Sequence, residues 1–194
     1  MKIIFLDIDG VLNSESAYRN GECQYVEWEH LEGPLKGEKD HHQAFAKKSK
    51  MLLNSLIKMT GAKVVISSTW RMSGIEVMKR IWEVEEMEGE IIGITPNLRT
   101  REYTVPRGCE IDYFLREIGF YHINWSEEEQ LAVMEKSGVE NYIIIDDDSD
   151  MLYGQRNHFV HVLPSPRNKD GFNEHFFEIS MSKLSKNIVK LNYK

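Results

Sequence analysis

Five short runs of apolar residues recur along the 194-residue chain, and their spacing constrains the fold more than any other feature. Most of the runs are nearly continuous Ile, Val and Leu rather than alternating, which is typical of strands covered on both faces in a parallel sheet. The sequence predicts strands at KIIFLD (2–7), KVVIS (63–67), EIIGIT (90–95), YIIID (142–146) and HFVHVL (158–163).

Segments with helical periodicity separate these runs. Helices are predicted over 43–59, 75–87, 109–118, 127–136 and 174–186. Asp40 and Gln43 resemble a capping box for the first helix, and Gly61 is placed to end it. Strands that alternate with helices predict an α/β fold, here a Rossmann-like, doubly wound parallel sheet of about five strands.

One polar stretch, residues 14–42, does not fit the alternation. It contains several glycines and a proline, and we expect a loop or small hairpin rather than a domain. Its aromatic residues Tyr25 and Trp28 are expected to pack the excursion onto the body, although stacking on a base is the alternative. We therefore expect residues 1–194 to form a single domain without a large cap domain.

Charge and cysteine content narrow the functional classes. The formal net charge of −7 argues against a protein that coats nucleic acid, but it permits binding of a nucleotide or a nucleic-acid end at one local site. The two cysteines are not arranged as a disulfide framework, and no apolar run is long enough for a membrane span. These features predict a cytoplasmic protein, while the oligomeric state stays open.

Acidic residues follow two of the predicted strands. Asp7 and Asp9 end the first strand, and Asp146 and Asp147 end the fourth. Because ligands collect at the carboxyl ends of parallel strands, these carboxylates should converge on one point. Such a cluster needs compensation by protons or by a divalent cation, and ligands that are all oxygen favour Mg²⁺. Nearby hydroxyls and Arg107 suit the oxygens of a phosphate.

In this order the segments resemble the four motifs of the haloacid dehalogenase (HAD) superfamily of phosphotransferases. The first two motifs imply that Asp7 is the nucleophile, Asp9 the general acid/base and Ser67 the hydroxyl that binds the phosphoryl group. Arg107 stands in the position of the third motif's basic residue. The fourth motif implies Asp146 and Asp147 as metal-binding residues. The resemblance thus implies a Mg²⁺ site on the residues Asp7, Asp9, Asp146 and Asp147.

Two assignments around the phosphate are less direct. Ser68 is the alternative to Ser67 as the phosphate-binding hydroxyl, because both follow the apolar run of the second strand. Arg71, just past the same strand, is expected to be a second phosphate contact. Asp150 is a candidate support for the metal-binding residues.

A finer resemblance concerns the substrate. The segments VVISSTWR, RGCEIDYFL and YIIIDDDSDM resemble capless phosphatase domains of nucleic-acid end-repair enzymes, similar to polynucleotide kinase-phosphatases. The resemblance implies a Mg²⁺-dependent phosphomonoester hydrolase with an aspartyl-phosphate intermediate. It also implies a nucleotide or a phosphorylated nucleic-acid end as substrate. The alternatives are a small-metabolite phosphatase or phosphomutase and a non-catalytic module that binds phosphate or metal.

Overall fold

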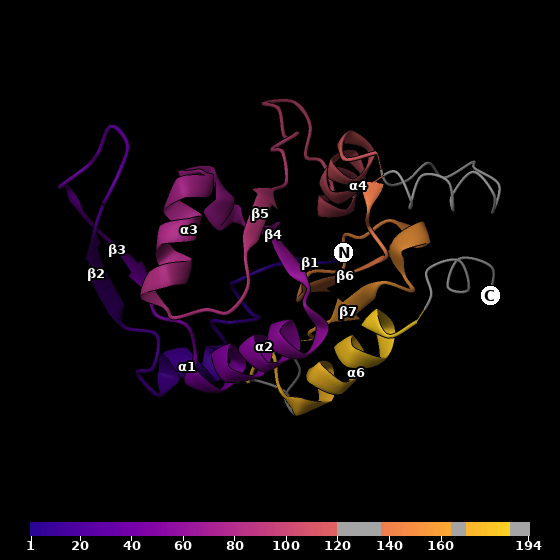
Figure 1. The fold of residues 1–194 in the computed structure, drawn as a ribbon, viewed down its shortest axis with the longest axis horizontal. Coiled ribbons are helices and arrows are strands. Elements are labelled where there is room, and N and C mark those ends of the chain that lie inside the picture. Colours follow the sequence, from indigo (N-terminus) through magenta and orange to yellow (C-terminus); the bar gives the residue numbers. More distant parts are fainter. Residues whose placement is uncertain (120–136, 164–169, 187–194) are drawn as a thin grey trace.

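The computed structural model describes residues 1–119, 137–163 and 170–186. A five-stranded parallel sheet forms the centre, with the order β5-β4-β1-β6-β7 (Figure 1). The strands span Lys2–Leu6 (β1), Lys63–Ile66 (β4), Ile91–Ile94 (β5), Asn141–Asp146 (β6) and Phe159–His161 (β7). The predicted α/β, Rossmann-like class is confirmed, and each strand coincides with a predicted run to within two residues at either end.

Helices cover both faces of the sheet (Figure 1). The α-helices span Glu15–Arg19 (α1), Lys47–Thr60 (α2), Ile75–Val84 (α3), Arg107–Glu117 (α4) and Glu174–Leu184 (α6), and two 3₁₀ turns span Thr69–Ser73 (η1) and Tyr153–Gln155 (η2). Side chains of α2, α3 and α6 share one apolar cluster, whereas those of α4 belong to a second cluster that includes Phe5. No helix among the described residues is long and apolar enough to cross a membrane.

The first predicted helix begins later than expected, and its predicted capping box is wrong. Asp40 and Gln43 belong to a strand, and α2 begins at Lys47 after Ala46, which provides no side-chain cap. The strand forms instead because its residue His42 is buried against Glu85. The helix does end at Gly61, whose φ of 63° is left-handed, as expected. The predicted helix over 127–136 lies outside the described residues.

The excursion after β1 contains α1 and a two-stranded antiparallel hairpin, Tyr25–Glu29 (β2) and Lys39–Gln43 (β3). The hairpin stands beside α3 and is not part of the main sheet (Figure 1). Trp28 is 6% exposed and packs into the core, as predicted, whereas Tyr25 is 70% exposed. The extent of the chain as one domain stays a prediction.

A buried ionic contact fastens the hairpin to the body. The Glu85 carboxylate accepts hydrogen bonds from His42 Nε2 (2.9 Å), Lys50 Nζ (2.8 Å) and the amide of Phe45 (3.3 Å). Glu85 is 4% exposed. Burial alone would raise the pKa of this carboxyl, but the bonds from His42 and Lys50 hold it below its ordinary value of 4.5.

We expect Glu85→Ala to lower the free energy of unfolding by about 3 kcal/mol, because it leaves a buried imidazole and an ammonium without their partner. Glu83→Ala removes an exposed carboxylate from the last turn of α3, two residues before Glu85. This variant should change the free energy of unfolding by less than about 0.5 kcal/mol. Folding lowers the pKa of Glu85. The contribution of its carboxylate to the free energy of unfolding is therefore complete above about pH 4.5 and is lost as the pH falls further. Urea denaturation at pH 7 and pH 4 measures both effects, and equal losses in the two variants would contradict the assignment.

Candidate active site

The carboxyl ends of β1 and β6 place two aspartates side by side. Asp7 directly follows β1, and Asp146 is the last residue of β6. The two strands are parallel neighbours, and the Asp7 amide donates to the carbonyl of Ile145 at 3.0 Å. Asp7 is 4% exposed and Asp146 is fully buried. The sequence therefore buries two ionisable groups at the edge of the sheet, where ligands collect.

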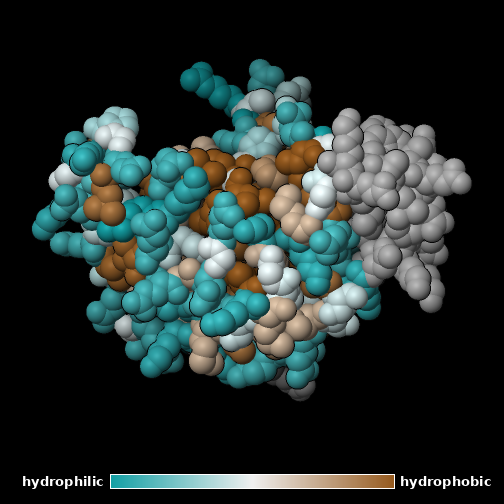
Figure 2. Space-filling view, viewed as in Figure 1, coloured by the Kyte–Doolittle hydropathy of each residue, from teal (hydrophilic) through white to brown (hydrophobic). Residues whose placement is uncertain are grey.

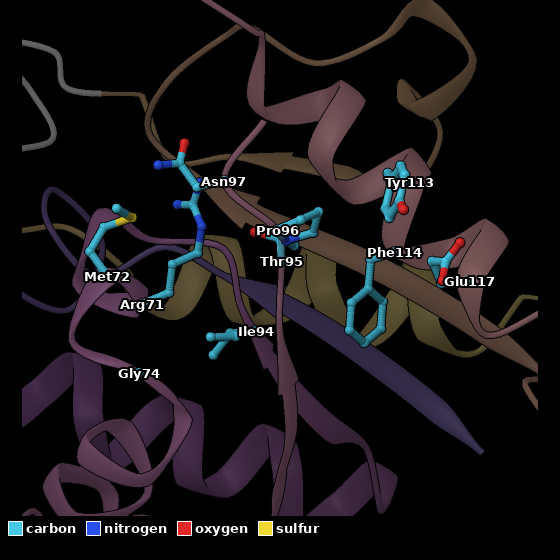
Figure 3. A pocket seen from close by; sticks show the side chains of 10 residues that line it. All are labelled: Arg71, Met72, Gly74, Ile94, Thr95, Pro96, Asn97, Tyr113, Phe114 and Glu117. Carbon is cyan, nitrogen blue, oxygen red and sulfur yellow. The ribbon is translucent and has the colours of Figure 1, made fainter. Parts of the chain in front are cut away.

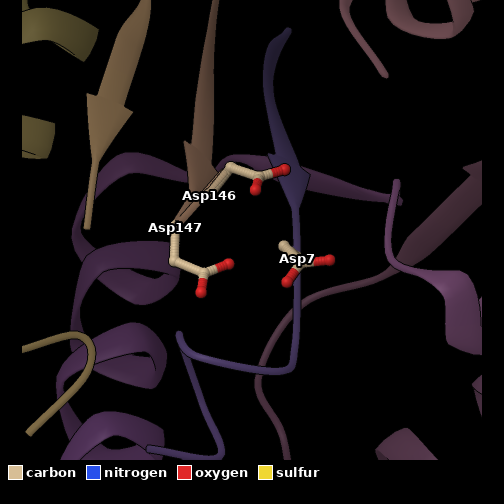
Figure 4. A group of neighbouring side chains, drawn as sticks. All are labelled: Asp7, Asp146 and Asp147. Carbon is tan, nitrogen blue, oxygen red and sulfur yellow. The ribbon is translucent and has the colours of Figure 1, made fainter. Parts of the chain in front are cut away.

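Asp147 joins these two residues to form a three-carboxylate group. One carboxylate oxygen from each of Asp7, Asp146 and Asp147 lies within 4.8 Å of the others, and the side chains converge on one point (Figure 4). This group can hold a metal ion. Its ligands are all oxygen, the donor set that hard divalent cations prefer. Asp9, which was predicted as a fourth metal ligand, does not belong to the group.

Arg107 supplies a guanidinium that bridges two of the carboxylates. Its Nη1 donates to Asp7 Oδ1 at 2.5 Å and to Asp146 Oδ2 at 2.7 Å. The residue begins α4, and its backbone amide donates to Asp150 Oδ2 at 2.8 Å. Asp150 thus satisfies an amide at the start of the helix and fixes the backbone from which the arginine reaches the site.

The electrostatics show a deficit of positive charge. Burial, more than any neighbour, raises the pKa of Asp7 to about 6 and that of Asp146 to about 8. Burial and the adjacent Asp148 also raise the pKa of Asp147. The guanidinium of Arg107 opposes these shifts. Burial by itself would lower the pKa of Arg107, but Asp7 and Asp146 outweigh it, so the net effect is a raised pKa. Among the described residues, only Arg107 forms ion pairs with these carboxylates, and a divalent metal would reduce the imbalance of charge.

Gly10 allows the cluster to close. Its φ is 76°, a left-handed conformation that L side chains rarely adopt. A Cβ at this position would lie 2.1 Å from Asp147 Oδ2. The carboxylate of Asp147 therefore occupies the space that only a glycine leaves free, which explains why this glycine follows the two aspartates.

Asp9 lies apart from the buried carboxylates. Its side chain is exposed, and its Oδ2 accepts a hydrogen bond from Trp70 Nε1 at 3.0 Å. The tryptophan lies in η1, directly after the two serines that follow β4. Sequence reasoning quoted this tryptophan within the motif but assigned it no role. No spacing rule pairs an indole with a carboxylate 61 residues away.

The two serines differ in their hydrogen bonds. The amides of Ser67 and Ser68 both donate to the carbonyl of Leu6, at 3.0 and 3.3 Å, so that the serines lie level with Asp7. The hydroxyl of Ser68 accepts from the Trp70 amide and begins η1. The Ser67 hydroxyl is buried and has no hydrogen-bond partner among the described residues. Ser67 is therefore the serine with a hydroxyl still available for a ligand.

Arg71 is hydrogen-bonded to the loop that carries the two serines. Its guanidinium donates to the carbonyls of Ser67 (2.6 Å) and Ser68 (2.9 Å) and to Glu110 Oε2 (2.5 Å). The side chain is 7% exposed, and burial lowers its pKa. The guanidinium is therefore largely committed to the protein. Its predicted contact with phosphate stays a prediction, and its carboxylate partner on α4 was not foreseen.

Arg71 also lines a hollow of about 430 Å³, which lies between the segment after β5 and α4 (Figure 3). Ile94, Thr95 and Pro96 form one wall, and Tyr113 and Phe114 of α4 form the other. Apolar side chains also gather on the surface near β5, surrounded by hydrophilic ones (Figure 2). This hollow is predominantly apolar and contains none of the three clustered aspartates.

Comparison with known protein families gives a match over most of the chain. A family model described as "HAD domain in Swiss Army Knife RNA repair proteins" matches residues 3–174. The matched range runs from β1 to the first residue of α6 and includes every site residue described above. No curated protein and no solved structure matches the chain.

Proposed function

The chain belongs to the family of HAD domains in Swiss Army Knife RNA repair proteins, and on this premise we propose that it is a Mg²⁺-dependent phosphomonoesterase acting on phosphorylated nucleic-acid ends or nucleotides. The observation that carries the proposal is the bridge from Arg107 to Asp7 and Asp146. A single guanidinium between a nucleophile and a metal-binding carboxylate can stabilise the charge of a phosphoryl group in transit.

In the proposed reaction, a carboxylate oxygen of Asp7 attacks phosphorus as the bond from phosphorus to the ester oxygen breaks. Arg107 and the free hydroxyl of Ser67 contact the phosphoryl oxygens. Asp9, held by Trp70, donates a proton to the departing ester oxygen. The products of this step are an aspartyl-phosphate on Asp7 and a neutral alcohol.

In the second half of the reaction, Asp9 takes a proton from a water molecule, whose oxygen attacks phosphorus and releases Asp7 and inorganic phosphate. A magnesium ion held by Asp7, Asp146 and Asp147 would neutralise part of the negative charge on the transferring group. We assign phosphate contacts first to Ser67 and Arg107. Ser68 and Arg71 instead hold the loop that carries Ser67, because their side chains are engaged there.

The direct test measures phosphate release with magnesium from a panel of substrates. The panel contains oligonucleotides with a 3′- or 5′-phosphate, free nucleotides and sugar phosphates, with the Asp7→Asn protein as the blank. We expect turnover on oligonucleotide ends or nucleotides to exceed that on sugar phosphates by at least about tenfold in kcat/KM. Turnover confined to sugar phosphates would favour a small-metabolite phosphatase. Silence across the panel with magnesium bound would favour a non-catalytic module.

A further inference from the structure

A second hollow, of about 380 Å³, lies between the hairpin and the body of the protein. The residues that line it come from β2, β3, η1 and α3, and they are Tyr25, Trp28, Asp40, His41, His42, Gln43, Thr69, Trp70, Ser73, Val77 and Ile81. We propose that this hairpin pocket binds the nucleoside that carries the scissile phosphate. The proposal rests on the proposed function and identifies the leaving group of that reaction.

The position of Trp70 connects the hairpin pocket to the chemistry. Trp70 lines the pocket, and its Nε1 donates to Asp9 Oδ2 at 3.0 Å. In the proposed reaction Asp9 gives its proton to the departing oxygen, so the leaving group lies on the Asp9 side of the phosphorus. A group bound against Trp70 is therefore on the leaving-group side of the site, away from the three clustered carboxylates.

The side chains of the hairpin pocket select for a flat and uncharged group. Two indoles, a phenol and two imidazoles form its aromatic surface, and such rings bind nucleobases by stacking. Among the described residues, the lining contains one carboxylate, Asp40, and neither Lys nor Arg. A second phosphate would therefore find no Lys or Arg to pair with there, whereas a neutral base needs none. The volume is near the lower end of small-molecule pockets, which suits one nucleoside rather than a stretch of chain.

Two buried ring nitrogens of the same lining have no partner among the described residues, namely Trp28 Nε1 and His42 Nδ1. The indole nitrogen is a donor. Because His42 Nε2 donates to Glu85, its Nδ1 is an acceptor in the neutral imidazole. The pocket thus carries an unpaired donor and an unpaired acceptor, and the edge of a nucleobase presents both kinds of group. Buried polar atoms without partners are rare in native proteins and point to a ligand.

The hairpin wall is held in place, while one of its aromatic rings is free to stack. His42 is hydrogen-bonded to Glu85 of the body, and Glu85 is also held by Lys50. On the other strand of the hairpin, the carbonyl of Glu29 accepts from Arg80 Nε at 3.2 Å. Tyr25, by contrast, is 70% exposed and contacts His41 edge-on, at 5.0 Å between ring centroids. Its ring is therefore an accessible aromatic surface of the pocket, and its removal should leave the fold intact.

The test compares two phosphorylated oligonucleotides that differ only in whether the terminal nucleotide carries a base or is abasic. For the unmodified protein, we expect the base to raise kcat/KM at least about fivefold, the lower end of what one base stacked on an aromatic ring contributes. Tyr25→Ala should remove this preference, measured as the ratio of kcat/KM for the two substrates, whereas Tyr25→Phe should retain it. Separate 3′- and 5′-phosphate series identify which end is used.

Two control variants locate the effect. Tyr113→Ala changes the hollow beside α4, and Tyr153→Ala removes an exposed tyrosine from η2, outside both hollows. Neither should alter the preference for a terminal base. A preference that survives Tyr25→Ala but disappears in Tyr113→Ala would place the base beside α4 and overturn the proposal. Equal turnover of both substrates by the unmodified protein would overturn it as well.

A binding measurement separates failure of this inference from failure of the proposed function. Titration calorimetry with unphosphorylated adenosine and uridine requires no turnover. We expect at least one of them to bind the unmodified protein, and Tyr25→Ala to weaken that binding at least about fivefold. If no substrate is hydrolysed but a nucleoside binds in this way, the proposed function fails and the pocket stands. If phosphate is released but no nucleoside binds, the pocket proposal fails alone.

Discussion

Asp7→Asn is expected to reduce phosphate release by at least about 1,000-fold, equivalent to about 4 kcal/mol of transition-state stabilisation. The amide has nearly the same shape as the carboxylate but is a very poor nucleophile toward phosphorus. The fold should persist, because Arg107 retains its bond to Asp146. Initial rates under saturating magnesium measure the loss, and circular dichroism checks the fold.

Asp148→Asn is the matched control for this variant. It makes the same chemical change in the acidic segment after β6, close to the site, but Asp148 is exposed and lies outside the three-carboxylate group. Its activity should stay within about twofold of the unmodified protein. Ordinary turnover by Asp7→Asn would rule out the nucleophile assignment, and an equal loss in both variants would show that the loss is not specific to Asp7.

Removal of divalent metal by EDTA is expected to lower turnover by at least about 100-fold, and excess Mg²⁺ should restore it. One guanidinium does not balance three neighbouring carboxylates, so a metal-free site would face the phosphate with excess negative charge. Asp147→Asn should raise the magnesium concentration needed for half-maximal activity, whereas Asp148→Asn should not. Full activity in EDTA would refute the metal site.

The same site predicts how metal binding depends on pH. A metal must displace protons from its carboxylate ligands, and burial raises the pKa of Asp7 to about 6 and of Asp146 to about 8. Lowering the pH from 8 to 6 protonates these ligands in the metal-free protein. The apparent affinity for Mg²⁺ should therefore fall over this range, with proton release on binding. A calorimetric titration in buffers of different ionisation enthalpy measures both quantities.

The sheet could be predicted because most of its strands are nearly continuous apolar runs, and four of the five are followed by or end in an acidic or hydroxyl residue. The same pattern predicted that Asp7 and Asp146 lie close together, since they end neighbouring strands, but it also included Asp9, which lies outside the three-carboxylate group. Helix ends were harder to predict. Asp40 and Gln43 have the residue types of a capping box, yet the tertiary contact between His42 and Glu85 places that segment in a strand. Long-range burial overrode a local signal.

The finer features of the site depend on contacts that sequence spacing does not encode. The bond from Trp70 to Asp9 joins residues from different loops, and the ion pair between Arg71 and Glu110 joins η1 to α4. Sequence reasoning placed Arg71 near the phosphate because it follows a strand, whereas the structure shows it bonded to two loop carbonyls. An arginine's strand-end position identifies its neighbourhood but not its partner.

The hairpin also bears on how a protein of this shape can evolve. Its strands form no hydrogen-bonded pair with the five-stranded sheet, and its two ends are tied together where Ala44 N donates to the carbonyl of Gln24 at 2.8 Å. Substitutions at its exposed positions, such as Tyr25, leave the aspartates and Arg107 untouched. If the hairpin pocket binds the nucleoside as proposed, specificity and catalysis reside on separate segments, so selection can change one without rebuilding the other.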